Sequence, residues 1–424
     1  MSFAYRLLLL FILSIPFLPA VDPAWLRPAA ALGGAAMLGL AAIAPRQDLL
    51  AASRELRIFS LALLFPLVWM LLQVVPVPDS LANPIWHMAS AALKQSSGLS
   101  TVSVAPDNTL GCLFAWLSLV AIFVAGLIIC RDRTRAAACF LALGVVTTLI
   151  SLQALLGRLG IPEGLPAASG MFFMSAMGLL VNSGILIASW GRLRRRSADR
   201  PSGGEWVKLA VAVLGIVVCG DVLRVSAQLA DLIVALSGPA TLFFIAMARR
   251  LRSGPRLALT AYLAITALAA LLAGPQWQES WSIPGLARSS DMDAVAAAQR
   301  AIANTPALGN GVGSFASTIS IYQDMRASPI LPVSAMSSVA VEWGRPALLI
   351  VLVLALQFFT HAFVGAIGRG RDWLYPSTAA ASVFVITADA FLGPSLLEGT
   401  SQILVAVILA IGASQVGSHS MATD

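Results

Sequence analysis

The sequence predicts an all-α integral membrane protein that crosses the bilayer about twelve times. Of its 424 residues, 58% are hydrophobic and only 11% are charged, whereas a soluble domain carries about 25% charged residues. The mean hydropathy is +0.85. Apolar runs of about 20 residues, the length that a membrane span needs, recur along most of the chain. A chain with so little charge cannot cover a water-facing surface, so lipid must be its solvent.

Twelve apolar runs are the candidate spans. They lie near residues 5–21, 29–45, 58–76, 109–130, 136–157, 170–191, 206–222, 228–248, 256–274, 346–367, 376–392 and 399–416. The first run follows Arg6 and has the alternative of a cleavable signal peptide. We favour an uncleaved first helix, because a second apolar run follows closely and the residues between them fit an A-x-A cleavage site poorly.

Charge alternates between successive loops. The arginine-bearing loops hold Arg46, Arg54 and Arg57; Arg131, Arg133 and Arg135; Arg192, Arg194, Arg195, Arg196 and Arg200; Arg249, Arg250, Arg252 and Arg256; and Arg369 and Arg371. The opposite loops hold single cations such as Arg27, Lys94, Arg158 and Arg224. Because positive loops stay in the cytoplasm, we expect both termini there. These loops also account for the net charge of +7, which therefore does not indicate a nucleic-acid partner.

Two long loops, 77–108 and 275–345, then face outward. They divide the chain into a bundle of about nine helices (1–274), a large outer loop (275–345), three C-terminal helices (346–416) and a cytoplasmic tail (417–424). The large loop contains a helix-like stretch at 291–304 and a glycine-rich turn. No internal repeat is visible, which weighs against the duplicated halves of many transporters.

The glycine-rich turn, NTPALGNGVGSF, places Gly309, Gly311 and Gly313 at the spacing of a phosphate-binding loop. A nucleotide fingerprint needs a strand before the glycines, and a P-loop needs a following GK[ST]. Neither is present, and the loop faces outward. We therefore expect a structural turn with positive φ angles. A nest of backbone N–H groups that holds phosphate is the open alternative.

Cysteines and histidines are few. The four cysteines form no CxxC pair, so the sequence predicts neither a disulfide framework nor a zinc site. The whole chain has three histidines.

Five short segments carry a resemblance to a known family. They are WMLLQVVPVPDSL (69–81), VSVAPDNTL (102–110), NTPALGNGVGSF (304–315), VEWG (341–344) and DAFLGPSLLEG (389–399). In this order and at these topological positions, they resemble the O-antigen ligase and Wzy-type polymerase superfamily of bacterial envelope proteins. The resemblance covers roughly residues 58–416.

The resemblance implies a twelve-helix, GT-C-like fold in the bacterial inner membrane. It also implies transfer of a glycan from an undecaprenyl-pyrophosphate carrier on the periplasmic face, during O-antigen or exopolysaccharide synthesis. The carrier's pyrophosphate is the leaving group, so neither metal nor nucleotide is implied. Such a reaction needs cations that hold the departing pyrophosphate. It also needs a base that takes the proton of the acceptor hydroxyl.

Three polar motifs of the family are altered in this chain. The Ser-Arg pair corresponds to Ser226 and Ala227, with Arg224 two residues earlier. The His-Asn pair before the E-x-G glutamate corresponds to Val333 and Ser334. The F-x-N-x-N stretch reads FFMSAM (172–177) and has no asparagine.

The remaining candidates for chemistry are one acid and three cations. Glu342 is the candidate base, although an exposed glutamate with an ordinary pKa is a poor base at neutral pH. Arg224, Arg300 and Arg345 are candidate pyrophosphate ligands. Each has a structural alternative: a marker of a helix end for Arg224, a helix C-terminal cation for Arg300, and an interfacial anchor for Arg345.

Three functions remain open at this stage. The first is a ligase- or polymerase-like glycosyltransferase that acts on lipid-linked glycan. The second is a non-catalytic member of a polysaccharide assembly complex with other membrane proteins. The third is a flippase or transporter. The lack of repeats and the lack of charge deep in the spans weigh against the third, with Asp389 the nearest exception.

Overall fold

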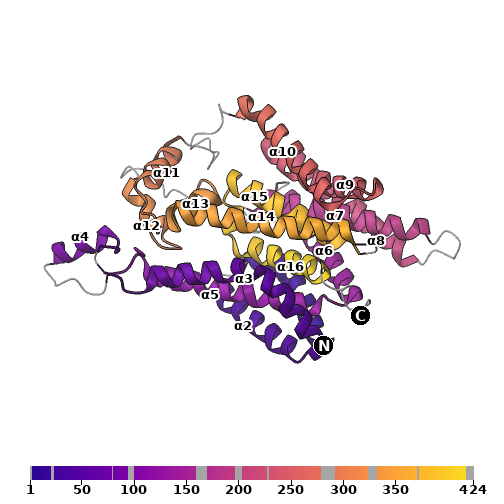
Figure 1. The fold of residues 1–424 in the computed structure, drawn as a ribbon, viewed down its shortest axis with the longest axis horizontal. Coiled ribbons are helices and arrows are strands. Elements are labelled where there is room, and N and C mark those ends of the chain that lie inside the picture. The colour runs from indigo at the N-terminus through magenta and orange to yellow at the C-terminus, as the bar shows by residue number, and fades with distance from the viewer. Residues whose placement is uncertain are drawn as a thin grey trace.

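The computed structural model describes residues 2–20, 23–78, 80–93, 100–158, 170–195, 203–226, 229–277, 292–322, 332–369 and 372–416. Every regular element within these ranges is a helix, as the sequence predicts. Figure 1 shows that α3, α5, α14 and α16 run along the long axis of the molecule, with α10 inclined to them.

The N-terminal elements are α1 (Ser2–Ser14), η1 (Ile15–Ala20), α2 (Pro23–Ala42), α3 (Arg46–Val74), α4 (Pro84–Leu93) and α5 (Pro106–Ile129). The middle elements are α6 (Arg133–Arg158), α7 (Met171–Arg195), α8 (Gly203–Ser226), α9 (Leu229–Arg250) and α10 (Pro255–Trp277). Next come α11 (Met292–Asn304), α12 (Phe315–Ile319), η3 (Ser320–Tyr322) and α13 (Ala335–Glu342). The chain closes with α14 (Arg345–Gly368), α15 (Leu374–Leu392), η4 (Ser395–Leu397) and α16 (Gly399–Val416).

Local sequence explains where several helices begin. Proline is the first residue of α4, α5 and α10, where its missing N–H costs no helical hydrogen bond. The short helix α13 begins at a capping box, in which Ser334 and Ser337 each bond the backbone of the other. Helix α4 lies in the loop 77–108, in which the sequence analysis identified no helix.

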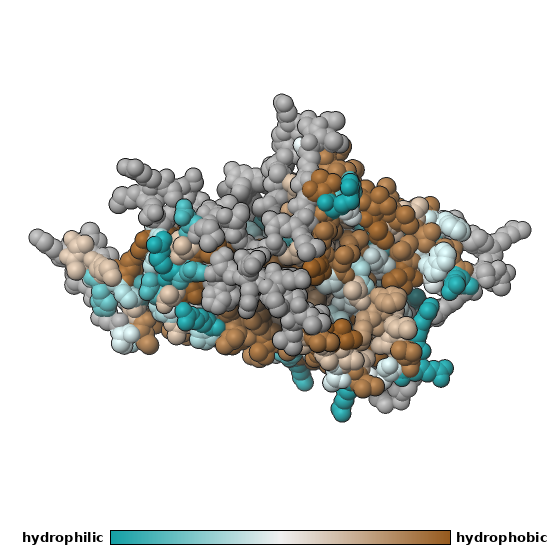
Figure 2. Space-filling model, turned by 90° about the horizontal axis from the view of Figure 1, so that it is seen from above, coloured by the Kyte–Doolittle hydropathy of each residue, from teal (hydrophilic) through white to brown (hydrophobic). Residues whose placement is uncertain are grey.

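Nine helices of the described residues are long and apolar enough to cross a bilayer: α3, α5, α6, α7, α8, α9, α14, α15 and α16. Three shorter apolar helices, Phe3–Leu18, Pro28–Ala42 and Pro255–Leu268, occupy the other three predicted spans. Large apolar side chains stay exposed on the long helices, including Phe114 (63%) and Phe243 (71%). Figure 2 shows hydrophobic residues over the middle of the visible surface and hydrophilic residues mainly near its two ends. The protein is therefore a multi-pass membrane protein.

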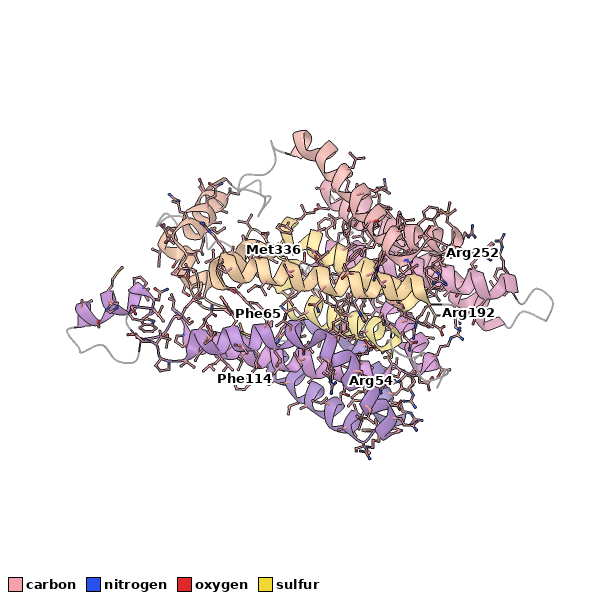
Figure 3. The ribbon with its side chains drawn as sticks, in the orientation of Figure 1. Arg54, Phe65, Phe114, Arg192, Arg252 and Met336 are labelled. Atoms are coloured by element: carbon pink, nitrogen blue, oxygen red, sulfur yellow. The ribbon has the colours of Figure 1, made fainter. Side chains whose placement is uncertain are left out.

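The two ends of the bundle differ. Arg54, Arg192 and Arg252 lie at one end, which we call the arginine end (Figure 3). Helices α4, α11, α12 and α13 lie at the opposite end, which we call the loop end (Figure 1). The predicted segregation of arginine-bearing loops from the two long loops is therefore present in the fold.

The first helix begins at the arginine end, and the last helix ends there. Near the end of α16, Gln415 Nε2 donates to the carbonyl of Cys130, 2.7 Å away, in the loop that carries Arg131. Near the start of α1, Tyr5 lies close to Arg135 in the first turn of α6. This placement agrees with the prediction that both termini share the side of the arginine-bearing loops.

Polar contacts join α6, α7 and α8 inside the apolar layer. Asn182 Nδ2 donates to Thr148 Oγ1 (3.1 Å) and to the Gly178 carbonyl (2.9 Å). The amide fits because Gly215 faces it, and a Cβ there would lie 2.5 Å from Asn182. Such interhelical hydrogen bonds stabilise helix packing in membranes.

Candidate functional site

At the loop end, one buried side chain joins segments that are more than 200 residues apart. Gln73, 1% exposed near the end of α3, donates through Nε2 to the carbonyls of Leu308 (2.8 Å) and Glu342 (2.9 Å). Its Oε1 accepts from the N–H of Val312 (3.1 Å). One amide thus uses both its donor and its acceptor to hold the glycine turn against the end of α13. We call this set of contacts the outer junction.

The glycine turn fits the outer junction because its residues lack side chains. Gly309, Gly311 and Gly313 have φ angles of 79°, 103° and 80°, as the turn prediction requires. A Cβ on Gly309 would overlap the carbonyl oxygen of Glu342, and one on Gly311 would overlap the side chain of Ser103. The N–H of Gly311 donates to that same Glu342 carbonyl (3.0 Å). These glycines therefore permit close backbone approach in addition to the left-handed conformation.

The loop 77–108 also contributes to the outer junction. Thr109 Oγ1 donates to the carbonyl of Val312 (2.9 Å) and lies 2.8 Å from Ser103 Oγ. The N–H of Val104 donates to the carbonyl of Asn310 (2.8 Å), and Asn83 Nδ2 donates to Asn310 Oδ1 (3.1 Å). The structure therefore brings the segments 102–110 and 304–315 together side by side.

The last of the five quoted segments reaches the same region through α13. The N–H of Ala335, the first residue of α13, donates to the carbonyl of Gly393 (2.9 Å). Trp69 Nε1 donates to the carbonyl of Trp343 (3.0 Å), at the opposite end of α13. Four of the five segments on which the family resemblance rests are thus hydrogen-bonded to one another at the loop end, and the fifth is bonded to the first residue of α13.

Glu342 is the ionisable group at the centre of the outer junction. It is 8% exposed, and its Oε1 accepts from the N–H of Phe315 (3.1 Å), at the start of α12. Burial raises the pKa of Glu342 to about 7, although hydrogen bonds from Gly313, Phe315 and Ser338 act in the opposite direction. A glutamate with an ordinary pKa would be a poor base at neutral pH. Burial gives Glu342 the proton affinity of a base that works near neutral pH.

The three candidate arginines each bind a protein group. Arg224 lies at the end of α8 and pairs with Asp221, Nη2 to Oδ1 3.0 Å, while 76% of its side chain is exposed. Arg300 on α11 donates to the carbonyl of Tyr322 (2.9 Å). Arg345 donates to the carbonyl of Ile302 (3.0 Å) in the last turn of α11, where a cation also meets the negative end of the helix dipole. Arg300 therefore lies on α11 and Arg345 binds the last turn of α11, whereas Arg224 lies on α8.

Two further acids of interest lie within the segment 389–399. Asp389, 9% exposed near the end of α15, is hydrogen-bonded by Ser395, and it lies close enough to Asp231 of α9 for their charges to interact. Glu398 accepts from the backbone of Gly170, and burial raises its pKa. The signal for Asp389 was a carboxylate inside an otherwise apolar run, which is costly and often functional.

Among the residues that the structure describes, no three His, Cys, Asp or Glu side chains are grouped so that they could hold a metal ion. No family model matches the sequence, and no curated protein matches it significantly. The case for a function therefore rests on the geometry of the outer junction and on the resemblance of the five segments.

Proposed function

We propose that this protein is an inner-membrane glycosyltransferase of surface polysaccharide synthesis, similar to O-antigen ligases and polymerases. It transfers a glycan from an undecaprenyl-pyrophosphate carrier to the hydroxyl of an acceptor sugar. The observation that carries the proposal is the buried Glu342, held where four of the five resembling segments meet. In this account the twelve predicted spans form a GT-C-like bundle, both termini are cytoplasmic, and the loop end faces the periplasm.

The chemistry assigned to Glu342 is general-base catalysis. The acceptor hydroxyl attacks the anomeric carbon of the carrier-linked sugar, a new C–O bond forms, and the bond to the pyrophosphate oxygen breaks. Glu342 takes the hydroxyl proton, and undecaprenyl pyrophosphate leaves. A base works best when its pKa is near the ambient pH, and burial gives Glu342 a pKa of about 7. A carboxylate with the usual pKa near 4.3 would accept this proton far less readily.

The outer junction supports this role because it fixes the position of the carboxyl group. The N–H of Phe315 donates to one carboxylate oxygen of Glu342, and the side-chain amide of Gln73 donates to the backbone carbonyl of Glu342. A catalytic group must be held in place by its surroundings to be effective. The arginines contribute less to the case, since each is already bound to a protein group.

A second function is favoured by the same hydrogen bonds. A carboxylate that accepts N–H groups at the start of α12 also serves as a structural anchor. Together with the replaced His-Asn and Ser-Arg motifs, this favours a non-catalytic member of a polysaccharide assembly complex as the alternative.

The test is deletion of the gene in its native bacterium, followed by profiling of surface and lipid-linked glycans. If the protein polymerises or ligates, long surface polymer disappears, short lipid-linked repeats accumulate, and the wild-type gene restores the polymer. An assembly partner without catalysis would instead leave polymerisation intact in membranes that contain the remaining machinery. Unchanged glycans of every class would contradict both functions.

Arg224→Ala supplies a separate arm of this test. The side chain is largely exposed, so its removal has little effect on folding. Loss of polymer at normal protein abundance would place Arg224 in carrier binding. Full restoration of polymer by Arg224→Ala would show that Arg224 does not take part in carrier binding.

A further inference from the structure

The carboxyl group of Glu342 accepts three hydrogen bonds, and one of them differs in kind from the other two. Two donors are backbone N–H groups, those of Gly313 and Phe315. The third is the side-chain hydroxyl of Ser338. Ser338 lies four residues before Glu342 on α13, so the two side chains share one face of the helix. Ser338 is 2% exposed and Glu342 is 8% exposed, so this contact is closed off from water.

A general base must be held in two protonation states. As a carboxylate, Glu342 only accepts hydrogen bonds, and the two N–H groups fit that state. Once the carboxylate has taken a proton, one of its oxygens carries an O–H that needs an acceptor, and an N–H group cannot accept. A hydroxyl both donates and accepts. Of the three partners, Ser338 alone therefore fits both states.

We propose that Ser338 is a positioning residue that holds Glu342 in both of its protonation states. Before the reaction, the Ser338 hydroxyl donates to the carboxylate. After Glu342 has taken the proton of the acceptor hydroxyl, the new carboxyl O–H donates to Ser338 Oγ. The Ser338 hydroxyl then turns its own proton to a backbone carbonyl of the preceding turn, a bond that helical serines commonly make. The catalytic part of this inference rests on the proposed function, whereas the contact itself does not.

Neighbouring charges do not take over this role. Helix α13 packs against α11, α12, α14, α15 and η4. At the loop end, the described ionisable groups of these elements are Asp293 and Arg300 of α11, Arg345 of α14 and Asp389 of α15. None of them is a cause of the raised pKa of Glu342, which reflects burial opposed by the three hydrogen bonds. Among the described residues, Ser338 is thus the one side chain that bonds this carboxyl group.

The adjacent Ser337 supplies a matched control. It is also fully buried, and its hydroxyl bonds only the backbone of Ser334, donating to the carbonyl (2.7 Å) and accepting from the N–H (3.1 Å). Ser337→Ala therefore removes a buried hydroxyl from the same helix as Ser338→Ala does, but it leaves the partners of Glu342 in place. Ser338→Thr is the conservative variant, because it keeps the hydroxyl.

The experiment is an infrared titration of the purified full-length protein in phosphatidylcholine nanodiscs, from pH 5 to pH 9. A protonated carboxyl group has a C=O stretching band that disappears on ionisation, and the band that is missing in Glu342→Gln belongs to Glu342. The pH midpoint of this band reports proton affinity. Its wavenumber reports the hydrogen bond of the carboxyl O–H, because loss of an acceptor shifts the band to higher wavenumber. Size-exclusion chromatography shows that each variant is folded before titration.

In Ser338→Ala, we expect the band at higher wavenumber and its midpoint raised by about one pH unit, because a hydrogen bond to an ionised group is stronger than one to a neutral group. Ser338→Thr should restore both values. Ser337→Ala should leave both at their wild-type values, although it lowers the unfolding temperature through loss of the capping box. The proposal is overturned if Ser338→Ala changes neither value, or if Ser337→Ala changes both equally.

Polymer formation provides the second readout. In membranes of the deletion strain that contain Ser338→Ala, the acid limb of the pH profile should move upward by the same amount as the infrared midpoint, since the ionised form of Glu342 is the active base. The infrared titration involves no glycan, so the two failures are distinguishable. A shifted band together with full polymer formation by Glu342→Gln would support the contact and contradict the proposed function.

Discussion

At the scale of single residues, the surroundings of Glu342 determine its proton affinity. The folded protein binds this proton more tightly than the unfolded chain, because burial raises the pKa to about 7 from an ordinary value near 4.5. The stabilisation is therefore complete below about pH 4.5 and is lost as the pH rises through about 7. The full effect is on the order of 3 kcal/mol.

The corresponding prediction concerns Glu342→Gln, whose amide carries no titrating proton. Between pH 5 and pH 8, the unfolding free energy of wild type should fall relative to that of Glu342→Gln, by up to roughly 3 kcal/mol. Parallel thermal unfolding of both proteins in the same detergent, at several pH values, measures the difference. A difference that stays constant over this range would show that Glu342 does not titrate there.

Arg345 provides a second prediction at this scale. Its bond to the Ile302 carbonyl satisfies the last turn of α11, so Arg345→Ala should destabilise α11 locally by about 1 kcal/mol. Arg345→Lys keeps the charge and should retain more than half of that stability. Amide hydrogen exchange of α11 provides the measurement, and equal protection in wild type and Arg345→Ala would refute the capping role.

At the scale of elements, the outer junction depends on backbone segments that approach closely. Gly311 has a φ of 103°, and a Cβ there would overlap Ser103. Gly311→Ala should therefore lower the unfolding free energy by about 2–4 kcal/mol, from backbone strain and steric overlap together.

Gly220→Ala is the matched control for this substitution. Gly220 lies within α8, and a Cβ there would meet no atom within 4 Å. The control should be neutral or slightly stabilising, because alanine favours the helix. Thermal unfolding at one scan rate compares the two variants. If both substitutions lower the thermal unfolding midpoint equally, the turn does not depend on close packing at Gly311.

The elements also show what the sequence could and could not predict. Apolar runs predicted the long helices, because lipid demands continuous hydrophobic length. The glycine spacing predicted positive φ angles, and these are present. The contact of Glu342 with α3 was not predictable, since Gln73, which bonds its backbone carbonyl, is 269 residues away in the chain. The Asp231–Asp389 pair depends likewise on the register of two helices, which a single sequence does not contain.

At the scale of the whole molecule, the proposed function requires the loop end to face the periplasm. Met88 on α4 is 68% exposed at the loop end, and Ser53 on α3 is exposed near Arg54 at the arginine end. In intact cells with a permeabilised outer membrane, a membrane-impermeant maleimide should label Met88→Cys. Ser53→Cys should react only after the inner membrane is opened. Labelling in the reverse order would place the outer junction in the cytoplasm, where the proposed reaction does not occur.

The central claim is that the buried carboxyl group of Glu342 performs the chemistry at the outer junction. Glycan profiling of the deletion strain tests it most directly, with complementation by wild type, Glu342→Gln or Glu205→Gln. Glu205 is the control: a buried glutamate at the arginine end, paired with Lys208 at 2.9 Å. At equal abundance in the membrane, wild type and Glu205→Gln should restore long polymer. Glu342→Gln should reduce its rate of formation by about 10²-fold or more, the contribution expected of a general base. Full restoration of polymer by Glu342→Gln would contradict the account.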